Sequence, residues 1–447
     1  MSLPNVLIIG SGEYVSGIVS SDGSSSSSDK SKGVVALVMF DLRSRKKIGT
    51  RIAIAGTCGL KFPHIRQHFA SSIAGAYRDI DVSFDSFPAD DVARKTDSYK
   101  DAIATFVPGD LAIIFTPDDS HFEIAKACIE HGMHVCVTKP LVQTLQQHQE
   151  LAALALERGV MSYVEVHKRW DPIYIDARAR LRSFGDFSFF QAFMSQPKKQ
   201  LKTFSSWAGI SSDISFYLNS HHVDYHCWCM QGVAQPVSVT ASASTGVANS
   251  TLGRDCADSI TLMVQWRNHT STNLGVALYT ASWSASPSDV HRCGLALFFG
   301  AVSSANLIVF VQPAAFLLQR SQRRHHCGPS SSRLFRRFGD LFIRLLQPSF
   351  FQARASAPNL QTLSPYLIDA VIRYTPDDSG CFAGRHCYGY VTFEKFVEAA
   401  CEVRTGQRHP SSFSATLPTF DATMMVTAIL EAGRLSLMRG GALVSIE

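Results

Sequence analysis

Residues 116–172 read TPDDSHFEIAKACIEHGMHVCVTKPLVQTLQQHQELAALALERGVMSYVEVHKRWDP. This stretch gives the clearest indication of the fold. The apolar run just before it, residues 111–115, stops at a Thr-Pro pair, which predicts a strand that ends in a turn. Apolar residues at helical spacing over residues 122–129 predict an amphipathic helix. A short strand over residues 134–137 then leads to Lys139. Because ligands of open α/β sheets bind at the carboxyl ends of the strands, we expect Lys139 at a functional site.

The same alternation of strand and helix begins near the N-terminus. Residues 6–9 predict a first buried strand, and Gly10 and Gly12 follow it. Glycine permits the tight turn of the G-x-G-x-x-G pattern and lets backbone N–H groups approach a pyrophosphate at a helix N-terminus. Val15 takes the third glycine position. The sequence therefore predicts an α/β fold, with a Rossmann-type dinucleotide-binding domain and a doubly wound parallel sheet over residues 1–170.

The end of the second strand bears on which dinucleotide is used. This strand, over residues 51–55, ends without a carboxylate, the group that normally binds the ribose hydroxyls of NAD. Lys61 follows, and two interpretations of it stay open: contact with the 2′-phosphate of NADP, or an ordinary surface lysine. The expected cofactor is therefore NADP or NAD, with NADPH favoured.

The block around Lys139 resembles the glucose–fructose oxidoreductase / inositol dehydrogenase / MocA-like family of NAD(P)-dependent enzymes. TP-x-x-x-H, Lys-Pro and a later R-x-x-P occur here in the order and spacing of that family. Thr138 stands where the family signature, Glu-Lys-Pro, has its glutamate, while Lys139 and Pro140 match. With this resemblance, we expect cofactor contacts from Gly10, Gly12, Glu13, Tyr14, Thr57, Lys61, Thr116, Pro117, His121 and Lys139.

A helix predicted over residues 213–228, DISFYLNSHHVDYHCW, lies where the family carries D-x-G-x-H-x-x-D-x-x-x-W. The pattern places its histidine at His221 and its second aspartate at Asp224, while Tyr217 replaces the first aspartate. The resemblance implies that Lys139 and His221 are the catalytic residues and face each other. A lysine ammonium stabilises the alkoxide charge that develops during carbonyl reduction, and a histidine supplies the proton. The alternative is a surface lysine and a core histidine.

Within the family, several segments look most like fungal D-galacturonate reductases, which reduce the aldehyde of a hexuronic acid to L-galactonate. A uronate carboxylate needs a cationic partner, and Lys168 and Arg169 end a predicted strand over residues 162–166. A solvated strand end is the alternative for both. The expected contacts to a sugar-acid substrate come from Lys168, Arg169, Tyr217, His222 and Asp224. The alternative functions are a non-catalytic NADPH-binding sensor and a dehydrogenase acting on another sugar or polyol.

The same helix also permits a metal hypothesis, because it is dense in ligand atoms. His222 and His226 are one helical turn apart, as in helical zinc sites. No separate motif offers a third ligand at a recognisable spacing, and the hydride chemistry of the family needs no metal. We therefore expect no metal site.

The second half of the chain has a different pattern. Apolar and β-branched residues alternate with polar ones over several segments, which predicts an α+β substrate domain with an open, mainly antiparallel sheet over residues 171–447. The expected strands cover residues 187–193, 237–242, 260–266 and 274–280, and a helix is expected over residues 421–437.

Composition limits the function classes. With 447 residues, 46% hydrophobic and 18% charged, the chain is long enough for two globular domains. The net charge of +5 is too mild to indicate a nucleic-acid partner. Eleven scattered cysteines and no signal-peptide pattern favour a reducing, cytoplasmic location. A homo-oligomer stays open.

Residues 292–360 depart from the rest of the substrate domain. Arginine and phenylalanine abound there, Asp340 is the only acidic residue between positions 290 and 368, and residues 295–318 carry no charge. That uncharged run is long enough to span a bilayer. The two hypotheses are translation of out-of-frame or intron-derived sequence, and a membrane anchor. Either way, this segment is expected to pack poorly in an ordered sheet.

Overall fold

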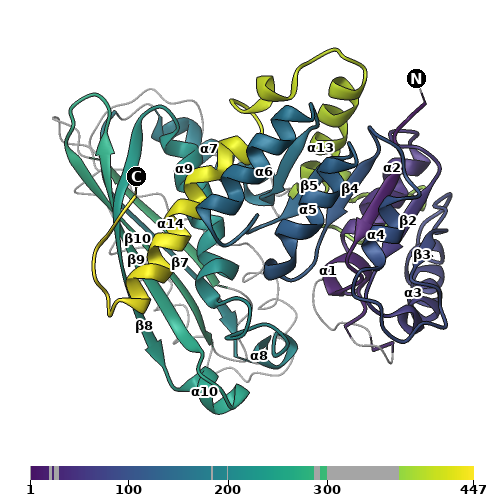
Figure 1. Ribbon diagram of the computed structural model, residues 1–447, viewed down its shortest axis with the longest axis horizontal. Coiled ribbons are helices and arrows are strands. Elements are labelled where there is room, and N and C mark those ends of the chain that lie inside the picture. The colour runs from purple at the N-terminus through teal and green to yellow at the C-terminus, as the bar shows by residue number, and fades with distance from the viewer. Residues whose placement is uncertain are drawn as a thin grey trace, which may run out of the picture. The chain divides into compact units, whose positions relative to one another are not determined.

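Two six-stranded sheets organise the chain in the computed structural model (Figure 1). The described residues belong to one compact unit, Met1–Gln312 together with Val371–Glu447. The structure describes residues 2–446 apart from residues 20–22, 25–29, 183–184, 199, 286–291 and 300–371.

The first sheet is parallel throughout, with the order β3-β2-β1-β4-β5-β6. Its strands are β1 (Val6–Ile9), β2 (Ile52–Ala55), β3 (Asp85–Phe87), β4 (Leu111–Ile114), β5 (His134–Thr138) and β6 (Ser162–Glu165). The connecting helices are α1 (Glu13–Ser16), α2 (Val35–Ser44), α3 (Phe62–Phe69), α4 (Ser98–Ile103), α5 (His121–Glu130) and α6 (Leu145–Glu157).

Helices cover both faces of this sheet, which explains why its strands are continuous apolar runs. Along β1, Ile8 packs into a core cluster with α2, whereas Leu7 packs into a second cluster with α5. Gly132, which has a positive φ of 82°, follows the end of α5 and lets the chain turn towards β5. The doubly wound domain is therefore confirmed.

The second sheet is mixed, with the order β11-β7-β10-β9-β8-β12. Only the β10–β7 pair is parallel among the described pairs. Its strands are β7 (Phe187–Pro197), β8 (Ala234–Thr245), β9 (Ala257–Asn268), β10 (Leu274–Ala285), β11 (Arg292–Phe299) and β12 (Val444–Ser445). The strand pattern predicted from the sequence is thus confirmed, and each of the four predicted strands is longer than expected.

One face of the second sheet is buried under helices. Alternate residues of β9, such as Leu262, Val264 and Trp266, lie in a core cluster with residues of the covering helices. These helices are α7 (Pro172–Leu181), α9 (Ser220–Met230) and α14 (Phe420–Met438). Figure 1 shows α14 lying along both α6 and the second sheet, so this helix joins the two layers.

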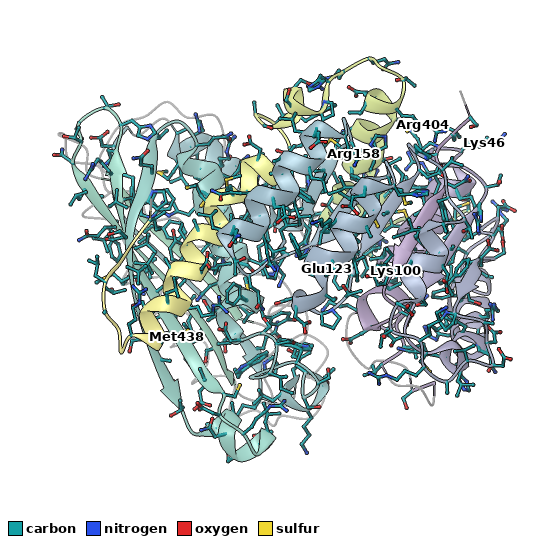
Figure 2. The ribbon with its side chains drawn as sticks, in the orientation of Figure 1. Lys46, Lys100, Glu123, Arg158, Arg404 and Met438 are labelled. Atoms are coloured by element: carbon teal, nitrogen blue, oxygen red, sulfur yellow. The ribbon has the colours of Figure 1, made fainter. Side chains whose placement is uncertain are left out.

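Part of the C-terminal segment, expected in the second domain, packs on the first domain instead. Helix α13 (Tyr388–Arg404) packs on the first domain, where Phe393 and Phe396 lie in the same core cluster as Ile8. At its end, Arg404, labelled in Figure 2, lies 3.5 Å from Asp110. The apolar face of α13 is buried against the Rossmann sheet, so residues 372–417 extend the dinucleotide domain rather than the substrate domain.

The expected loss of sheet pattern at Arg292 is not what the structure shows. Arg292–Phe299 form β11, which pairs antiparallel with β7 at the edge of the second sheet. A short, mostly apolar run can serve as an edge strand without strict alternation. The rest of the unusual segment, residues 300–371, lies outside the described residues. Within the described residues, no helix is long and apolar enough to cross a membrane.

The assignment of α13 to the first core can be tested by mutating one of its buried residues. Phe393→Ala removes a fully buried ring from the first core and should lower the free energy of unfolding by about 3–5 kcal/mol. Met438→Ala is the control, because Met438 is 76% exposed and its loss should change the same quantity by less than about 0.5 kcal/mol. Urea denaturation measures both. Equal, small changes would show that α13 does not belong to this core.

Candidate active site

The glycine turn after β1 leaves room for a pyrophosphate. Gly10 has a φ of +116°, and a Cβ there would lie 2.1 Å from the Phe115 carbonyl oxygen, so only glycine fits. A Cβ on Gly12 would meet nothing within 4 Å, because that side of the turn is open. Val15, at the third glycine position, is buried instead. This turn fits the phosphates of a dinucleotide.

Lys61 lies beneath this turn and contacts its backbone. Its Nζ donates hydrogen bonds to the carbonyl oxygens of Ser11, at 2.9 Å, and Ile18, at 3.2 Å. Burial lowers the pKa of this ammonium group. Lys61 therefore stabilises the turn, a role that neither the 2′-phosphate hypothesis nor the surface hypothesis describes. Thr57, by contrast, is exposed after β2 and is available to a ligand.

The Thr-Pro-x-x-x-His segment joins the ends of two strands. The buried ring of His121 lies 2.9 Å from the carbonyl oxygen of Thr116, after β4, and 3.0 Å from that of Pro140, after β5. Tyr14, in α1, stacks on Phe115 with ring centroids 5.2 Å apart. His121 thus holds the backbone of the expected cofactor site and does not itself face the surface.

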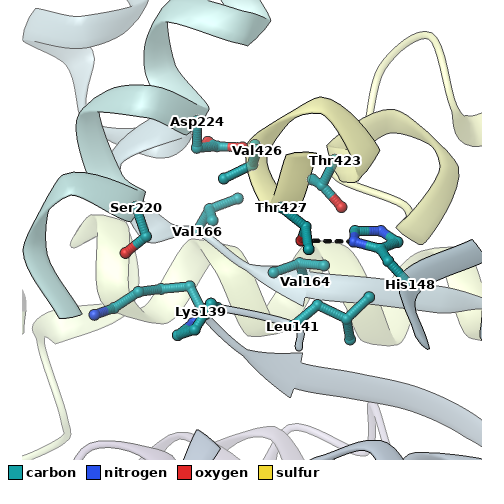
Figure 3. A pocket seen from close by; sticks show the side chains of 11 residues that line it. Lys139, Leu141, His148, Val164, Val166, Ser220, Asp224, Thr423, Val426 and Thr427 are labelled. Carbon is teal, nitrogen blue, oxygen red and sulfur yellow. Dashed lines mark hydrogen bonds between the residues drawn. The ribbon is translucent and has the colours of Figure 1, made fainter. Parts of the chain in front are cut away.

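Lys139 extends from the end of β5 to the helix that carries His221. Its Nζ donates to the carbonyl oxygen of Tyr217 and lies 4.3 Å from the centroid of the Tyr217 ring. Tyr217 belongs to a π-helical turn, η5 (Ser215–Asn219), directly before α9. Such turns are frequent at functional sites. Figure 3 shows Lys139 and Ser220, the first residue of α9, at the same small pocket.

The surroundings of Lys139 tune its charge. Burial lowers its pKa to about 8, while the negative charges of Asp118 and Glu165 oppose that shift. Asp118 itself accepts a hydrogen bond from the Ser212 hydroxyl, and burial raises the pKa of this carboxyl. At neutral pH, Lys139 is therefore mostly a cation, held between a carbonyl oxygen and nearby carboxylates.

His221 lies in the first turn of α9 and is almost entirely buried. Burial lowers its pKa well below the usual range, and the positive charge of Lys139 lowers it further. The ring therefore favours its neutral form at pH 7. Its Nδ1 has no hydrogen-bond partner among the residues that the structure describes. The ring of His167 lies beside it, with centroids 5.2 Å apart.

Lys168 and Arg169, the two cationic residues expected to contact the substrate, have different partners. Arg169 makes a bidentate ion pair with Asp224, with distances of 2.9 and 2.6 Å, and both side chains are buried. Each thus neutralises the other. Lys168 is half-buried, and its Nζ donates to the hydroxyl of Tyr174 at 3.2 Å. The same hydroxyl lies 3.4 Å from Nε2 of His222.

The pocket in Figure 3 is an internal space rather than a substrate cavity. Its volume is about 10 Å³, room for a single water molecule. Lys139, Asp224 and residues of α14 line it, and His148 closes one side through hydrogen bonds to Thr427 and to the Phe420 carbonyl oxygen, both 2.7 Å. The two hydrogen bonds of His148 therefore hold α6 against α14 beside this space.

Glu165, His167 and Lys30 were not predicted as site residues from the sequence. Glu165 and His167 lie at the end of β6, 2.9 Å apart, and Tyr388 of α13 stacks on His167. The rule that strand ends carry site residues, applied to β6, would have found the first two. Lys30 lies 5.9 Å from the Tyr14 ring and its charge acts on Lys139. No sequence signal marks Lys30, because it lies in a Ser-rich tract.

The histidines of α9 do not converge on a metal site. Nδ1 of His226 lies 2.5 Å from the Tyr279 hydroxyl, and its ring stacks on Phe190 with centroids 4.0 Å apart. His226 therefore belongs to the core of the second sheet. No group of three or more potential metal ligands occurs among the described residues.

Comparison with known proteins finds relatives of part of the nucleotide-binding half of the chain. The family described as "Oxidoreductase family, NAD-binding Rossmann fold" (GFO_IDH_MocA) matches residues 50–166. The oxidoreductase YdgJ of Escherichia coli, whose function is uncharacterised, is 35% identical over 118 residues, 26% of this chain and 34% of YdgJ. The scyllo-inositol 2-dehydrogenase (NADP(+)) IolW of Bacillus subtilis is 27% identical over 138 residues, 30% of this chain and 37% of IolW. The chain thus matches about a third of the length of these relatives.

Solved structures extend the likeness to the whole fold. The scyllo-inositol dehydrogenase of Lactobacillus casei with bound NAD(H) and scyllo-inositol aligns with a TM-score of 0.56 at 10% identity, over 99% of each chain. At this identity the likeness concerns the fold alone. The match over residues 50–166 confirms the expected cofactor class, NAD or NADP. The fit of the glycine turn agrees with it.

The contacts of Lys61 allow a test of whether it stabilises the turn or selects between the two cofactors. Lys61→Met removes the donor to two turn carbonyls and should weaken NADH and NADPH binding by a similar factor, about tenfold. Fluorescence titration of each dinucleotide measures this. Lys100→Met, on an exposed helix surface, is the control and should leave both affinities unchanged. A loss confined to NADPH would instead place Lys61 at the 2′-phosphate.

Proposed function

We propose that this chain is an NAD(P)H-dependent reductase that acts on the aldehyde of a hexuronic acid, with D-galacturonate converted to L-galactonate. The observation that carries the proposal is the Lys139 ammonium, held at the carboxyl end of β5 against the turn that leads into His221. When bound, the nicotinamide supplies the hydride. The chain's own residues supply the charge and the proton.

Lys139 is suited to stabilising negative charge on the carbonyl oxygen. Its ammonium is partly desolvated, and an electrostatic interaction is stronger where water is excluded. The Tyr217 carbonyl oxygen orients it, so little reorganisation is required when charge develops. A lysine in this setting favours the alkoxide-like transition state over the neutral carbonyl.

His221 is suited to exchanging the proton in its neutral form. A neutral imidazole can donate N–H to a developing oxyanion, and it can accept a proton from an alcohol in the reverse, oxidative direction. The depressed pKa favours neutral imidazole over imidazolium throughout the neutral range. We therefore expect the same residue to serve both directions of the reaction.

Lys168 is the group that makes a uronate the preferred substrate in this proposal. Its positive charge acts on both His221 and His222, which supports a role for this ammonium beside the proposed reacting centre. Arg169 is unsuited to that role, because its guanidinium is already neutralised by Asp224. In this proposal Lys168 binds the substrate carboxylate, while Arg169 and Asp224 stabilise α9.

The cofactor preference rests on the end of β2. Gly56 and Thr57 follow that strand, and neither carries the carboxylate that repels a 2′-phosphate. We propose that NADPH is accepted at least as well as NADH. Because Lys61 is engaged with the turn, this preference depends on the missing carboxylate rather than on a lysine contact.

The direct test is an assay with a panel of substrates and both cofactors. D-galacturonate, D-glucuronate and the neutral aldose D-galactose are each offered with NADPH and NADH, and scyllo-inositol is offered with NADP⁺ and NAD⁺. The proposal expects the highest kcat/KM for a uronate. Turnover of scyllo-inositol alone would favour a polyol dehydrogenase, like the enzyme that IolW is named for. Dinucleotide binding without any turnover would favour the sensor hypothesis.

The pKa of Lys139 predicts how the reduction rate changes with pH. Above a pH of about 8 the amine loses its proton, so the positive charge disappears and kcat/KM should fall. Lys139→Met should reduce kcat by about 10²-fold or more and abolish this alkaline decrease. Steady-state rates from pH 6 to pH 10 measure both. A variant with near-normal turnover would remove Lys139 from the chemistry.

The role of Lys168 predicts a difference between charged and neutral sugars. Lys168→Met should raise KM for D-galacturonate about tenfold or more, because a charge-assisted hydrogen bond to the carboxylate is lost. KM for D-galactose should stay close to that of the unsubstituted protein. Lys198→Met, outside the site, is the matched control. Equal effects of Lys168→Met on both sugars would show that Lys168 does not bind the carboxylate.

A further inference from the structure

The register of the first sheet places a carboxylate beside the position where the Lys-Pro motif lacks one. Thr138, the last residue of β5, is paired with Glu165, the last residue of β6. The Glu165 side chain is only 2% exposed, and a buried carboxylate needs partners that compensate its charge. Lys139 is one such partner, since the charge of Glu165 acts on it.

His167 is the second partner of Glu165. Its Nδ1 lies 2.9 Å from Glu165 Oε1, and an ionised carboxylate only accepts hydrogen bonds. Nδ1–H is therefore the donor, which leaves Nε2 as the nitrogen for proton exchange. The ring is fixed from one side by Tyr388, with centroids 5.3 Å apart and planes 27° apart. On another side it faces His221.

His221 has no carboxylate of its own in α9. Tyr217 stands where the resembling family has an aspartate, and Asp224 is committed to Arg169. His221 Nδ1 has no hydrogen-bond partner in the described part of the chain. The charged and titratable groups around this ring are Lys139, His167, Lys168 and His222. Of these, only His167 can both give and take a proton while a carboxylate holds it.

We propose that Glu165 and His167 form a proton-supply pair for His221. Glu165 holds His167 in one tautomer, and His167 restores the proton that His221 gives to the substrate oxygen. Both are positioning residues, since they act through His221. The inference rests on the proposed function, because it concerns the proton of the same carbonyl reduction.

The proton balance closes over one turnover. The substrate carbon gains a hydride from the reduced dinucleotide, and the substrate oxygen gains the proton of His221. Nε2 of His167 takes one proton from solvent, and that proton then moves to His221, directly or through one water. Each turnover consumes one solvent proton and returns both rings to their starting state. Glu165 stays ionised and stabilises the transient charge on His167.

The test compares His167→Ala and Glu165→Gln with the unsubstituted protein. We expect kcat to fall about 10²-fold in His167→Ala, with NADPH affinity little changed, and added imidazole to restore part of the rate. Glu165→Gln should enlarge the solvent deuterium isotope effect on kcat. His409→Ala is the control, because His409 is exposed, and imidazole should not alter its rate. Unchanged kcat in His167→Ala, or a loss that imidazole leaves untouched, would overturn the proposal.

A measurement without substrate keeps this inference separate from the proposed function. In ¹⁵N-histidine-labelled protein, NMR should show His167 as the Nδ1–H tautomer, and Glu165→Gln should turn it into a mixture and shift the His221 signals. This result is expected even if no sugar or polyol is turned over, in which case the proposed function alone fails. A tautomer mixture in the unsubstituted protein, or His221 signals indifferent to Glu165, would overturn the pair.

Discussion

The contact between the Lys139 ammonium and the Tyr217 carbonyl oxygen is the interaction on which the site depends. It joins the carboxyl end of β5, in the dinucleotide domain, to the π-turn that begins the helix of the substrate domain. An amine in this half-buried position needs an acceptor, and the turn offers a backbone one. His221 follows within one turn of helix, so the same contact also holds the residue that we propose exchanges protons.

Charge in the site is divided between neutralised and available groups. Arg169 and Asp224 cancel each other in a buried bidentate pair that anchors α9. Lys139 instead remains a partly compensated cation with a pKa of about 8, within the range where an enzyme operates. Burial and the neighbouring cations keep His221 neutral. A neutral proton donor beside a cation is the combination that reduction of a carbonyl to an alcohol requires.

The sequence predicted the strands, the glycine turn and the position of Lys139 at a strand end, because hydrophobic periodicity and strand ends are local signals. Contacts between residues far apart in the chain could not be predicted from the sequence. The engagement of Lys61 by two turn carbonyls, and of Arg169 by Asp224, depends on tertiary placement. The packing of α13 on the first core was not predicted, because an apolar helix does not reveal which sheet it covers. The pairing of Glu165 with Thr138 was not predicted, because it exists only through the register of neighbouring strands.

The most direct measurement is a crystal structure of the chain with an oxidised dinucleotide and L-galactonate. The arrangement predicts that the reactive hydroxyl oxygen of the sugar acid lies within hydrogen-bond distance of both Lys139 Nζ and a ring nitrogen of His221. The carbon that bears it should face C4 of the nicotinamide, with the carboxylate at Lys168. A sugar acid bound with its reactive oxygen away from Lys139, or a nicotinamide that does not reach the end of β5, would contradict this arrangement.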